Sequence, residues 1–217
     1  MGTEQALPTV NTQRGVRRLL DYVATYPHAQ LRFYSSDMIL NIDSDAAYLV
    51  LPKARSRVAG YFRLLDKLST SSFRHNGAIL VECKSIRSVV SSAAEAETHG
   101  VFHNAKIGVN LRHLLQQMGH PQPPTLIRTD NSTAVGFANK NIQMRKSKSW
   151  DMNLHWLRDR EHRKQFKLTW EKGSLNSADY HTKHHPTVYH RKMRKHYIRD
   201  VVSRSFSQMN IVIGGLV

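Results

Sequence analysis

The chain of 217 residues carries 32 Lys and Arg against 16 Asp and Glu, a formal net charge of +16, with 40% hydrophobic residues and one cysteine. This length suits one domain with a packed core. A single cysteine excludes a disulfide framework and any zinc site built from two or more thiolates. The positive charge favours a protein that binds a polyanion, most of all nucleic acid. The alternative is a basic protein that docks on another kind of partner.

Membrane and export signals are missing from the sequence. No run approaches the ~18 apolar residues that a membrane span needs. The first residues, MGTEQALPTV, lack the basic and apolar regions of a signal peptide. We therefore expect no membrane association, a reducing compartment, and a cytoplasmic or nuclear location with no secretion.

The first part of the chain changes from a helical to an extended pattern. The apolar spacing in residues 11–24, with Pro27 after it, predicts one amphipathic helix. The apolar and β-branched runs LRFY, MILNID, RVAGYFRLL and AILVECKSI predict strands, with Asn76-Gly77 as turn residues between the last two. These runs are typical of an antiparallel meander.

Helices and strands alternate in the rest of the chain. Residues 92–118 have helical spacing and end before Gly119. TLIRTD then predicts a short strand, residues 132–139 a short helix, residues 147–163 a basic helix and QFKLTW a strand, with helical turns through Asp179. The order predicts one α/β domain with a mixed sheet flanked by helices.

Positive charge gathers in the last third of the chain. Between Lys140 and Asp200 there are 16 basic and 6 acidic residues, a local net charge of +10, interleaved with tryptophans and tyrosines. Basic side chains follow phosphates and aromatic faces stack on bases, so this third is the predicted nucleic-acid footprint. The alternative is a solvated helical face over core aromatics, and we expect Trp156 and Trp170 to belong to the core.

Four acidic residues occupy matching places in the predicted elements. Asp45 and Asp130 close strands, Glu95 opens a helix, and Asp179 enters the last one. Ligands of open α/β sheets bind at such ends, so the four carboxylates should converge and hold a hard cation such as Mg²⁺ or Mn²⁺. Taken singly, each residue also has a structural explanation, as a turn residue for Asp45 and as helix-start residues for the other three.

The histidines and the cysteine give weaker signals. The four histidines of the late segment lack the cysteine that structural zinc sites use, and phosphate contact is favoured over zinc. They are His181, His184, His185 and His190. Cys83 lies mid-strand in LVECKSI, which predicts a buried and unreactive thiol.

Five motifs together resemble a known family. They are the strand-ending DSDAAYL, the helix-opening SSAAEAE, the strand-ending TDNSTA, the segment SKSWDMNLHWLRDRE and the late NSADYHTKH. Their order and spacing across residues 31–185 resemble the ribonuclease H domain of copia-type LTR-retrotransposon polyproteins. The resemblance implies an RNase H-like mixed five-stranded sheet, and a metal-dependent endonuclease that hydrolyses the RNA strand of RNA–DNA hybrids with two Mg²⁺ or Mn²⁺ ions.

Carried over motif by motif, the resemblance also implies which residues hold the metal ions. Asp45 would bridge both ions, Glu95 and Asp130 would complete one, and Asp179 the other. The nearest rival on the first strand is Asp43, which has the same strand parity as Asp45.

The rival on the helix is Glu97. It lies about 200° around the helix from Glu95, so both carboxylates cannot face one metal pair.

The resemblance further implies how a substrate is held. The basic helix after Lys140 would grip the DNA strand, while 2′-hydroxyls are read across the shallow minor groove. The residues expected to contact nucleic acid are Lys146, Lys148, Arg158, Arg160 and Lys183.

In this interpretation the chain has three parts. Residues 1–29 form a helix resembling the segment after a reverse transcriptase, residues 30–185 form the RNase H-like domain, and residues 186–217 form a basic extension with an apolar tail. A reverse transcriptase from the parent polyprotein is the implied protein partner.

One alternative is a catalytically inactive, nucleic-acid-binding remnant, favoured by the departure from the family motif at Trp150. An integrase core is disfavoured, because its triad has the order D, D, E.

Overall fold

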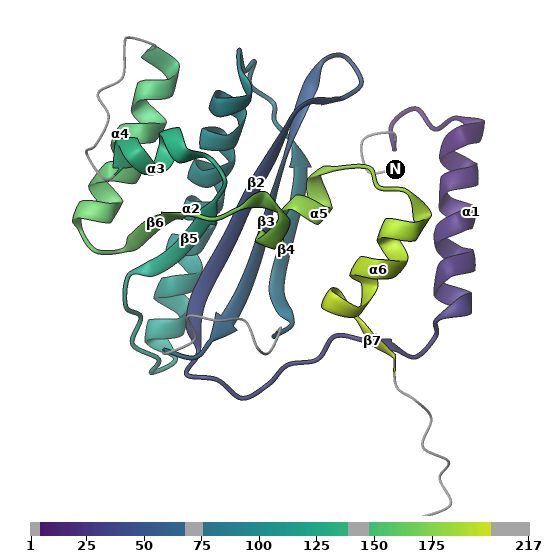
Figure 1. The fold of residues 1–217 in the computed structure, drawn as a ribbon, viewed down its shortest axis with the longest axis horizontal. Coiled ribbons are helices and arrows are strands. Elements are labelled where there is room, and N and C mark those ends of the chain that lie inside the picture. The colour runs from purple at the N-terminus through teal and green to yellow at the C-terminus, as the bar shows by residue number, and fades with distance from the viewer. Residues whose placement is uncertain (1–4, 68–75, 139–147, 201–217) are drawn as a thin grey trace, which may run out of the picture. The chain divides into compact units, whose positions relative to one another are not determined.

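The computed structural model describes residues 5–67, 76–138 and 148–200 (Figure 1). The chain divides into two compact units. The larger spans Phe33–Met193, and the smaller combines Met1–Arg32 with Arg194–Val217. The domain boundaries at residues 29/30 and 185/186 stay predictions.

A five-stranded mixed sheet forms the centre of the larger unit. Its strands are β2 (Ile39–Leu51), β3 (Arg55–Leu65), β4 (Ala78–Ser85), β5 (Thr125–Thr129) and β6 (Phe166–Trp170), in the spatial order β4-β3-β2-β5-β6. β2, β3 and β4 pair antiparallel, and β5 runs parallel to both β2 and β6. This arrangement, with its flanking helices, confirms the predicted fold class.

Helices connect and cover these strands (Figure 1). They are α2 (Ala93–Gln117), α3 (Ser132–Ala138), α4 (Lys148–His162), a 3₁₀ turn (Gly173–Leu175) and α5 (Asp179–Thr182). The helix α6 (Thr187–Tyr197) follows them in the chain. α2 packs on β2, β3 and β5, α4 packs on α2 and β6, and α5 contacts β2 and β3. The long, short and basic helices were predicted, whereas α6 was not, because its residues were expected to belong to a basic extension.

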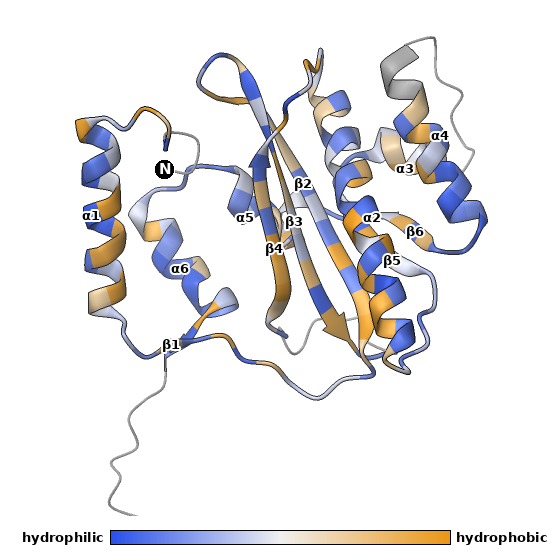
Figure 2. Ribbon diagram, turned by 180° about the vertical axis from the view of Figure 1, so that it is seen from behind, coloured by the Kyte–Doolittle hydropathy of each residue, from blue (hydrophilic) through white to orange (hydrophobic). Residues whose placement is uncertain are grey.

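The hydrophobic core lies between the sheet and the helices α2 and α4. Phe62 and Ile127 of the sheet pack there against Val101 of α2 and Leu157 of α4, and all four side chains are fully buried. Figure 2 shows hydrophobic residues along α2 and the strands, whereas α4 and α6 are mostly hydrophilic. The expectation for Trp156 holds in part, since it is half-buried and packs against this core.

A polar contact brings α2 close to the sheet. The side-chain amide of Asn104 donates to Ser44 Oγ and to the carbonyl oxygen of Ala59, both at 2.9 Å. A Cβ atom on Gly60 would lie 2.3 Å from Asn104 Oδ1, so only glycine permits this approach. Because Ser44 lies between two acidic residues of β2, the contact fixes α2 beside the strand that carries them.

Two predictions about the first strands are wrong. The run LRFY, residues 31–34, forms no strand. Asn76-Gly77 does not form a tight turn either, because β3 ends at Leu65 and β4 begins at Ala78. The buried Asn76 side chain instead accepts from the Tyr34 N–H at 2.8 Å and donates to the carbonyl oxygens of Leu64 and Tyr34. It thereby ties the irregular segment to the end of β3.

The smaller unit contains the predicted N-terminal helix, α1 (Val10–Thr25), and the paired strands β1 (Ala29–Gln30) and β7 (Arg199–Asp200). The Arg194 guanidinium lies 4.0 Å from the centre of the Tyr26 ring, donates to the Tyr22 hydroxyl and pairs with Asp200. None of the described helices is long and apolar enough to cross a membrane.

Replacing Asn76 should destabilise the larger unit. Asn76→Ala removes three hydrogen bonds, two to the part-buried backbone of Tyr34 and one to the buried carbonyl oxygen of Leu64, so we expect a loss of about 2–3 kcal/mol in the free energy of unfolding. Chemical denaturation measures it. The matched control is Asn110→Ala on the exposed face of α2, which should change stability little. Equal stability of the two variants would contradict the bridging role of Asn76.

Candidate active site

Two buried carboxylates lie two residues apart on β2. Asp43 and Asp45 are 0% and 3% exposed. Asp43 accepts from Arg128 Nε at 2.8 Å and from Arg63 Nη2 at 3.1 Å, and also from the Ser177 N–H. Two guanidinium groups therefore neutralise Asp43, and its role is structural.

Asp45 lies in a different electrostatic environment. Its Oδ2 accepts a hydrogen bond from the Thr182 hydroxyl. Burial raises the pKa of Asp45 to about 6, against the lowering effects of Thr182 and of the Lys183 ammonium. The charges of Asp179 and Asp130 contribute to this rise, so these carboxylates are electrostatic neighbours of Asp45.

Asp130 follows the last residue of β5. Its backbone carbonyl accepts a hydrogen bond from the indole of Trp170 at 3.0 Å. A Cβ atom on Gly173 would lie 3.0 Å from Asp130 Oδ2 and 3.9 Å from Asp179 Oδ1, so the missing side chain leaves room beside both carboxylates. Within the described part of the chain, Asp130 Oδ1 is buried without a hydrogen-bond partner. A buried carboxylate oxygen in this state is suited to a cation.

Asp179 is the first residue of the short helix α5 and pairs with Lys183, four residues later. The preceding turn is anchored to β2, because the side-chain amide of Asn176 donates to the carbonyl oxygen of Ser44 at 2.8 Å. Asn176 Oδ1 also accepts from the Ala178 N–H. The sequence NSAD thus holds Asp179 next to the strand that carries Asp45.

The structure separates the two glutamates at the start of α2. The carboxylate of Glu95 accepts from the Ser91 N–H at 2.7 Å and from the Ser91 hydroxyl at 2.6 Å. Glu97 instead lies near the other carboxylates. Its pKa is raised to about 7, first by burial and then by the charges of Asp130 and Asp45, while the Lys183 ammonium lowers it.

An asparagine holds the start of α2 near the end of β5. Asn131 Nδ2 donates to the carbonyl oxygen of Ala94 at 3.1 Å and to Thr98 Oγ1 at 3.3 Å. Its Oδ1 accepts from the Ala134 N–H in the first turn of α3. Asn131 therefore caps the start of α3, and the same side chain links the elements that carry Glu97 and Asp130.

The site therefore brings together three of the four sequence-predicted carboxylates, Asp45, Asp130 and Asp179. It adds Glu97 and leaves Glu95 outside, in a capping role at the helix start. The sequence contained a signal that favours Glu97 over Glu95. Glu97 stands four residues before Val101, and residues four positions apart lie on the same face of a helix. Val101 belongs to the apolar spacing that predicts this helix.

The ammonium group of a lysine pairs with one carboxylate of this site and interacts with two others through their charges. The charges of Asp45, Asp179 and Asp130 raise the pKa of Lys183, as does its hydrogen bond with Asp179, although burial opposes them. In the part of the chain that the structure describes, no group of three or more His, Cys, Asp or Glu side chains is arranged to hold a metal ion. Among the described residues, Lys183 pairs with Asp179, and its charge lowers the pKa values of Asp45 and Glu97.

The predicted nucleic-acid contacts have different placements. Lys146 lies outside the described residues, as does the side chain of Lys148. Arg158 and Arg160 are half-buried on α4, and the Arg160 guanidinium lies 4.9 Å from the centre of the Trp156 ring. Their contact with nucleic acid stays a prediction, and so does that of Lys183.

Two further predictions are wrong. Cys83 is exposed on β4 and its Sγ donates to the carbonyl oxygen of His181 at 3.1 Å. Trp170 is 56% exposed and lies outside the hydrophobic core. Its indole N–H donates to the backbone carbonyl oxygen of Asp130 at the end of the neighbouring strand. Among the late histidines, His190 Nδ1 lies 2.7 Å from the Tyr180 hydroxyl, and the His185 ring stacks on the ring of Tyr180.

Comparisons with known proteins find similarity only at the level of the fold. No protein-family model and no curated protein matches the chain. The N-terminal RNase H domain of a Mycobacterium tuberculosis protein is 12% identical, with 67% of this chain and 91% of that chain covered and a TM-score of 0.46. LC11-RNase H1 in complex with an RNA/DNA hybrid is 10% identical, with coverages of 65% and 92% and a TM-score of 0.48.

A viral enzyme is also similar. The prototype foamy virus protease–reverse transcriptase is 12% identical, with 66% of this chain and 20% of that chain covered and a TM-score of 0.42. Identities this low and TM-scores below 0.5 assign neither an activity nor a metal to this chain.

Removing the charge of each β2 aspartate should have different effects on folding. Asp43→Asn leaves the buried guanidinium of Arg63 without its full counter-charge and should cost about 3–5 kcal/mol in the free energy of unfolding. Asp45→Asn removes a carboxylate that repels its neighbours and should cost less than about 1 kcal/mol. Urea denaturation of both variants measures the difference. A larger loss in Asp45→Asn would show that the two roles are reversed.

Neutralising each glutamate of α2 should change stability with opposite signs. The pKa of Glu97 is higher in the folded state than in the unfolded chain, so its ionisation destabilises the fold increasingly as the pH rises from about 4.5 to about 7. In EDTA near pH 8, Glu97→Gln should therefore stabilise the protein by about 1 kcal/mol, allowing for solvent screening, and by less near pH 4.5.

The matched control is Glu95→Gln. It weakens two hydrogen bonds to Ser91 at the helix start and should cost about 0.5–1 kcal/mol at the same high pH. Thermal unfolding across this pH range measures both variants. A pH-dependent gain from Glu95→Gln and none from Glu97→Gln would contradict the assignment.

Proposed function

We propose that the larger unit is a metal-dependent endonuclease that hydrolyses the RNA strand of RNA–DNA hybrids. One observation carries the proposal: carboxylates from β2, α2, the end of β5 and the start of α5 are electrostatic neighbours, since the charges of Asp179 and Asp130 raise the pKa of Asp45, and those of Asp130 and Asp45 raise the pKa of Glu97. Keeping several carboxylates close together costs free energy, and this cost is typical of functional sites.

The proposed metal ligands are Asp45, Glu97, Asp130 and Asp179. This set replaces Glu95 of the motif-based assignment with Glu97, because Glu97 interacts with Asp45 and Asp130. Three features fit a hard cation: the donors are all carboxylate oxygens, Asp130 Oδ1 is buried without a hydrogen-bond partner among the described residues, and Gly173 leaves room beside two of the carboxylates.

Bound Mg²⁺ or Mn²⁺, two ions by the family resemblance, would supply Lewis-acid chemistry and an activated water for attack on a phosphodiester. The residues of the chain itself position this chemistry. Thr182 orients Asp45 by its hydrogen bond, and Asn131 holds the start of α2 against the end of β5. The raised pKa values of Asp45 and Glu97 mean that metal binding releases protons, so metal affinity should increase with pH.

The charge of the chain supports nucleic acid as the substrate class. The net charge of +16 favours binding to a polyanion, and half of the basic residues fall between Lys140 and Asp200. The choice of a hybrid over other nucleic acids, and the origin in a retrotransposon polyprotein, rest on the five sequence motifs. A reverse transcriptase from the same polyprotein would supply the hybrid.

A second candidate function is an inactive, nucleic-acid-binding remnant. The ion pair between Lys183 and Asp179 favours it, because an ammonium group among the carboxylates neutralises the charge that would attract a metal ion. The two candidates differ in one property. In an active enzyme, Mg²⁺ must displace the Lys183 ammonium from the carboxylates.

The decisive experiment is cleavage of a labelled RNA–DNA hybrid by the purified chain with Mg²⁺. We expect cleavage of the RNA strand that is lost in EDTA. Glu97→Gln should lower the rate by more than about 100-fold, because it removes a ligand. The matched control Glu95→Gln changes the same chemical group two residues away and should retain most of the activity.

Other results would contradict the proposal in defined ways. Equal cleavage in EDTA would exclude metal-dependent catalysis by this chain. No cleavage, together with no Mg²⁺-dependent rise in melting temperature, would favour the inactive remnant, since a ligand of the folded state raises that temperature. Loss of activity in Glu95→Gln with retention in Glu97→Gln would restore the motif-based assignment.

A further inference from the structure

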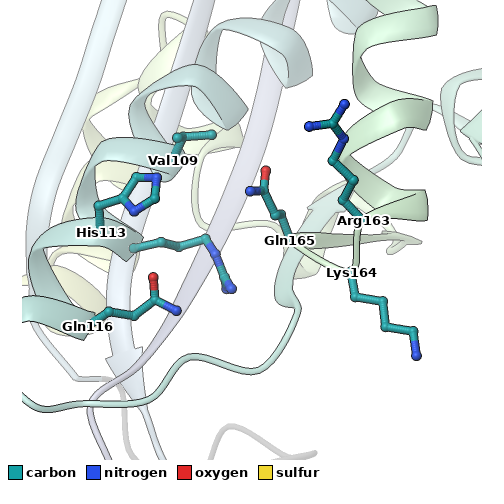
Figure 3. A pocket seen from close by; sticks show the side chains of 7 residues that line it. Val109, His113, Gln116, Arg163, Lys164 and Gln165 are labelled. Atoms are coloured by element: carbon teal, nitrogen blue, oxygen red, sulfur yellow. The ribbon is translucent and has the colours of Figure 1, made fainter.

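A pocket with several basic residues lies between α2 and the turn from α4 to β6 (Figure 3). Its volume is about 220 Å³. Figure 3 shows His113 and Gln116 of α2 on one side, and Arg163 and Gln165 of the turn on the other. The lining residues are Val109, Arg112, His113, Gln116, Arg163, Lys164 and Gln165, and none of them is acidic.

One wall of this pocket contains a buried guanidinium without a counter-ion. Arg112 is 7% exposed. It donates to three neutral oxygens: the carbonyl oxygens of Pro123 and Gln122, and the hydroxyl of Thr125. Among the described residues no carboxylate pairs with it, and burial alone lowers its pKa. A buried charge without an opposite charge nearby is costly, so an anion in the pocket would stabilise it.

Two further basic residues line the pocket. The side chain of Arg163 is 61% exposed and, among the described residues, forms an ion pair with Asp159 in the last turn of α4. Lys164 is exposed and has a positive φ of 56°. Exposed ion pairs are weak, so the guanidinium of Arg163 remains available to an entering anion.

The pocket is remote from the carboxylates. His113 lies sixteen residues after Glu97 on the same helix, which corresponds to about 24 Å along its axis. The parallel strands β5 and β6 also run away from the pocket. Their first residues, Thr125 and Phe166, lie at the end of the sheet near the pocket, and their last residues, Thr129 and Trp170, lie at the opposite end. The pocket is therefore a separate site, and its existence does not depend on the proposed function.

We infer that this pocket binds a phosphate group. A fixed guanidinium on one wall, with further basic side chains and amide side chains in the lining, matches the charge and hydrogen-bonding needs of phosphate oxygens. Carboxylates, which would repel an anion, are absent from the lining. The phosphate can belong to a free ester or to a nucleic-acid strand.

A second hollow lies next to the pocket and bears on the source of the phosphate. It has a volume of about 420 Å³, and Val109 lines both hollows. Lys106, Trp156 and Arg160 line this second hollow. A strand whose phosphate occupies the first pocket would extend along these residues, whereas a free phosphate would not reach them.

Isothermal titration calorimetry in EDTA tests the inference, because EDTA keeps metal ions out of the carboxylate site. The probes are inorganic phosphate and a short single-stranded oligonucleotide with and without a 5′-phosphate. The test variant is the double change Arg163→Gln, Lys164→Asn. The control is Lys53→Asn, Arg55→Gln, which removes the same charges from an exposed hairpin, where Lys53 has a similar φ of 62°.

We expect saturable phosphate binding that weakens at least about tenfold in the test variant and is unchanged in the control. Lys106→Gln distinguishes the two sources of the phosphate. If a nucleic-acid strand is the ligand, this change should weaken binding of the phosphorylated oligonucleotide and leave binding of inorganic phosphate unchanged. If a free ester is the ligand, it should weaken binding of neither of these two probes. Absence of saturable phosphate binding, or equal losses in the test and control variants, would overturn the inference. Circular dichroism confirms that each variant is folded.

Discussion

Repulsion between neighbouring carboxylates is the physical constraint that the rest of the larger unit must satisfy. Burial raises the pKa of Asp45 to about 6 and that of Glu97 to about 7; the charge of Asp130 raises both values, and the charge of Asp179 raises that of Asp45. Such a group is tolerated only when positive charge balances it. In the structure this charge comes from Lys183, and in an active enzyme it would come from metal ions.

The fold supplies the rigidity that this repulsion requires. The two arginines around Asp43 neutralise the first aspartate of β2, which leaves Asp45 as the member of the pair that faces the cluster. Asn131 holds the start of α2 to the end of β5, while Asn104 holds α2 and Asn176 holds the turn before α5 to β2, all through buried amides. Each of these amides donates to a backbone carbonyl oxygen, so the cluster is held together by neutral groups that do not alter its charge.

The sequence predicted the elements more reliably than the orientation of their side chains. Apolar spacing located α2, β5, α4 and β6 because each element buries one regular face. The choice between Glu95 and Glu97 depended on the rotation of α2 about its axis, which its packing against β2 and β3 determines. The run LRFY has the composition of a strand, yet Asn76 satisfies its backbone in an irregular path, a contact between residues 42 positions apart that no local pattern reveals.

The most direct test of the account is the position of bound metal. Crystals of the chain grown with Mn²⁺ would show the ion by anomalous diffraction, independently of any activity. The account predicts an anomalous peak in contact with the carboxylates of Asp45 and Glu97, with the Lys183 ammonium displaced from Asp179. A peak at Glu95, or no peak in the cluster while Lys183 keeps its ion pair with Asp179, would contradict it.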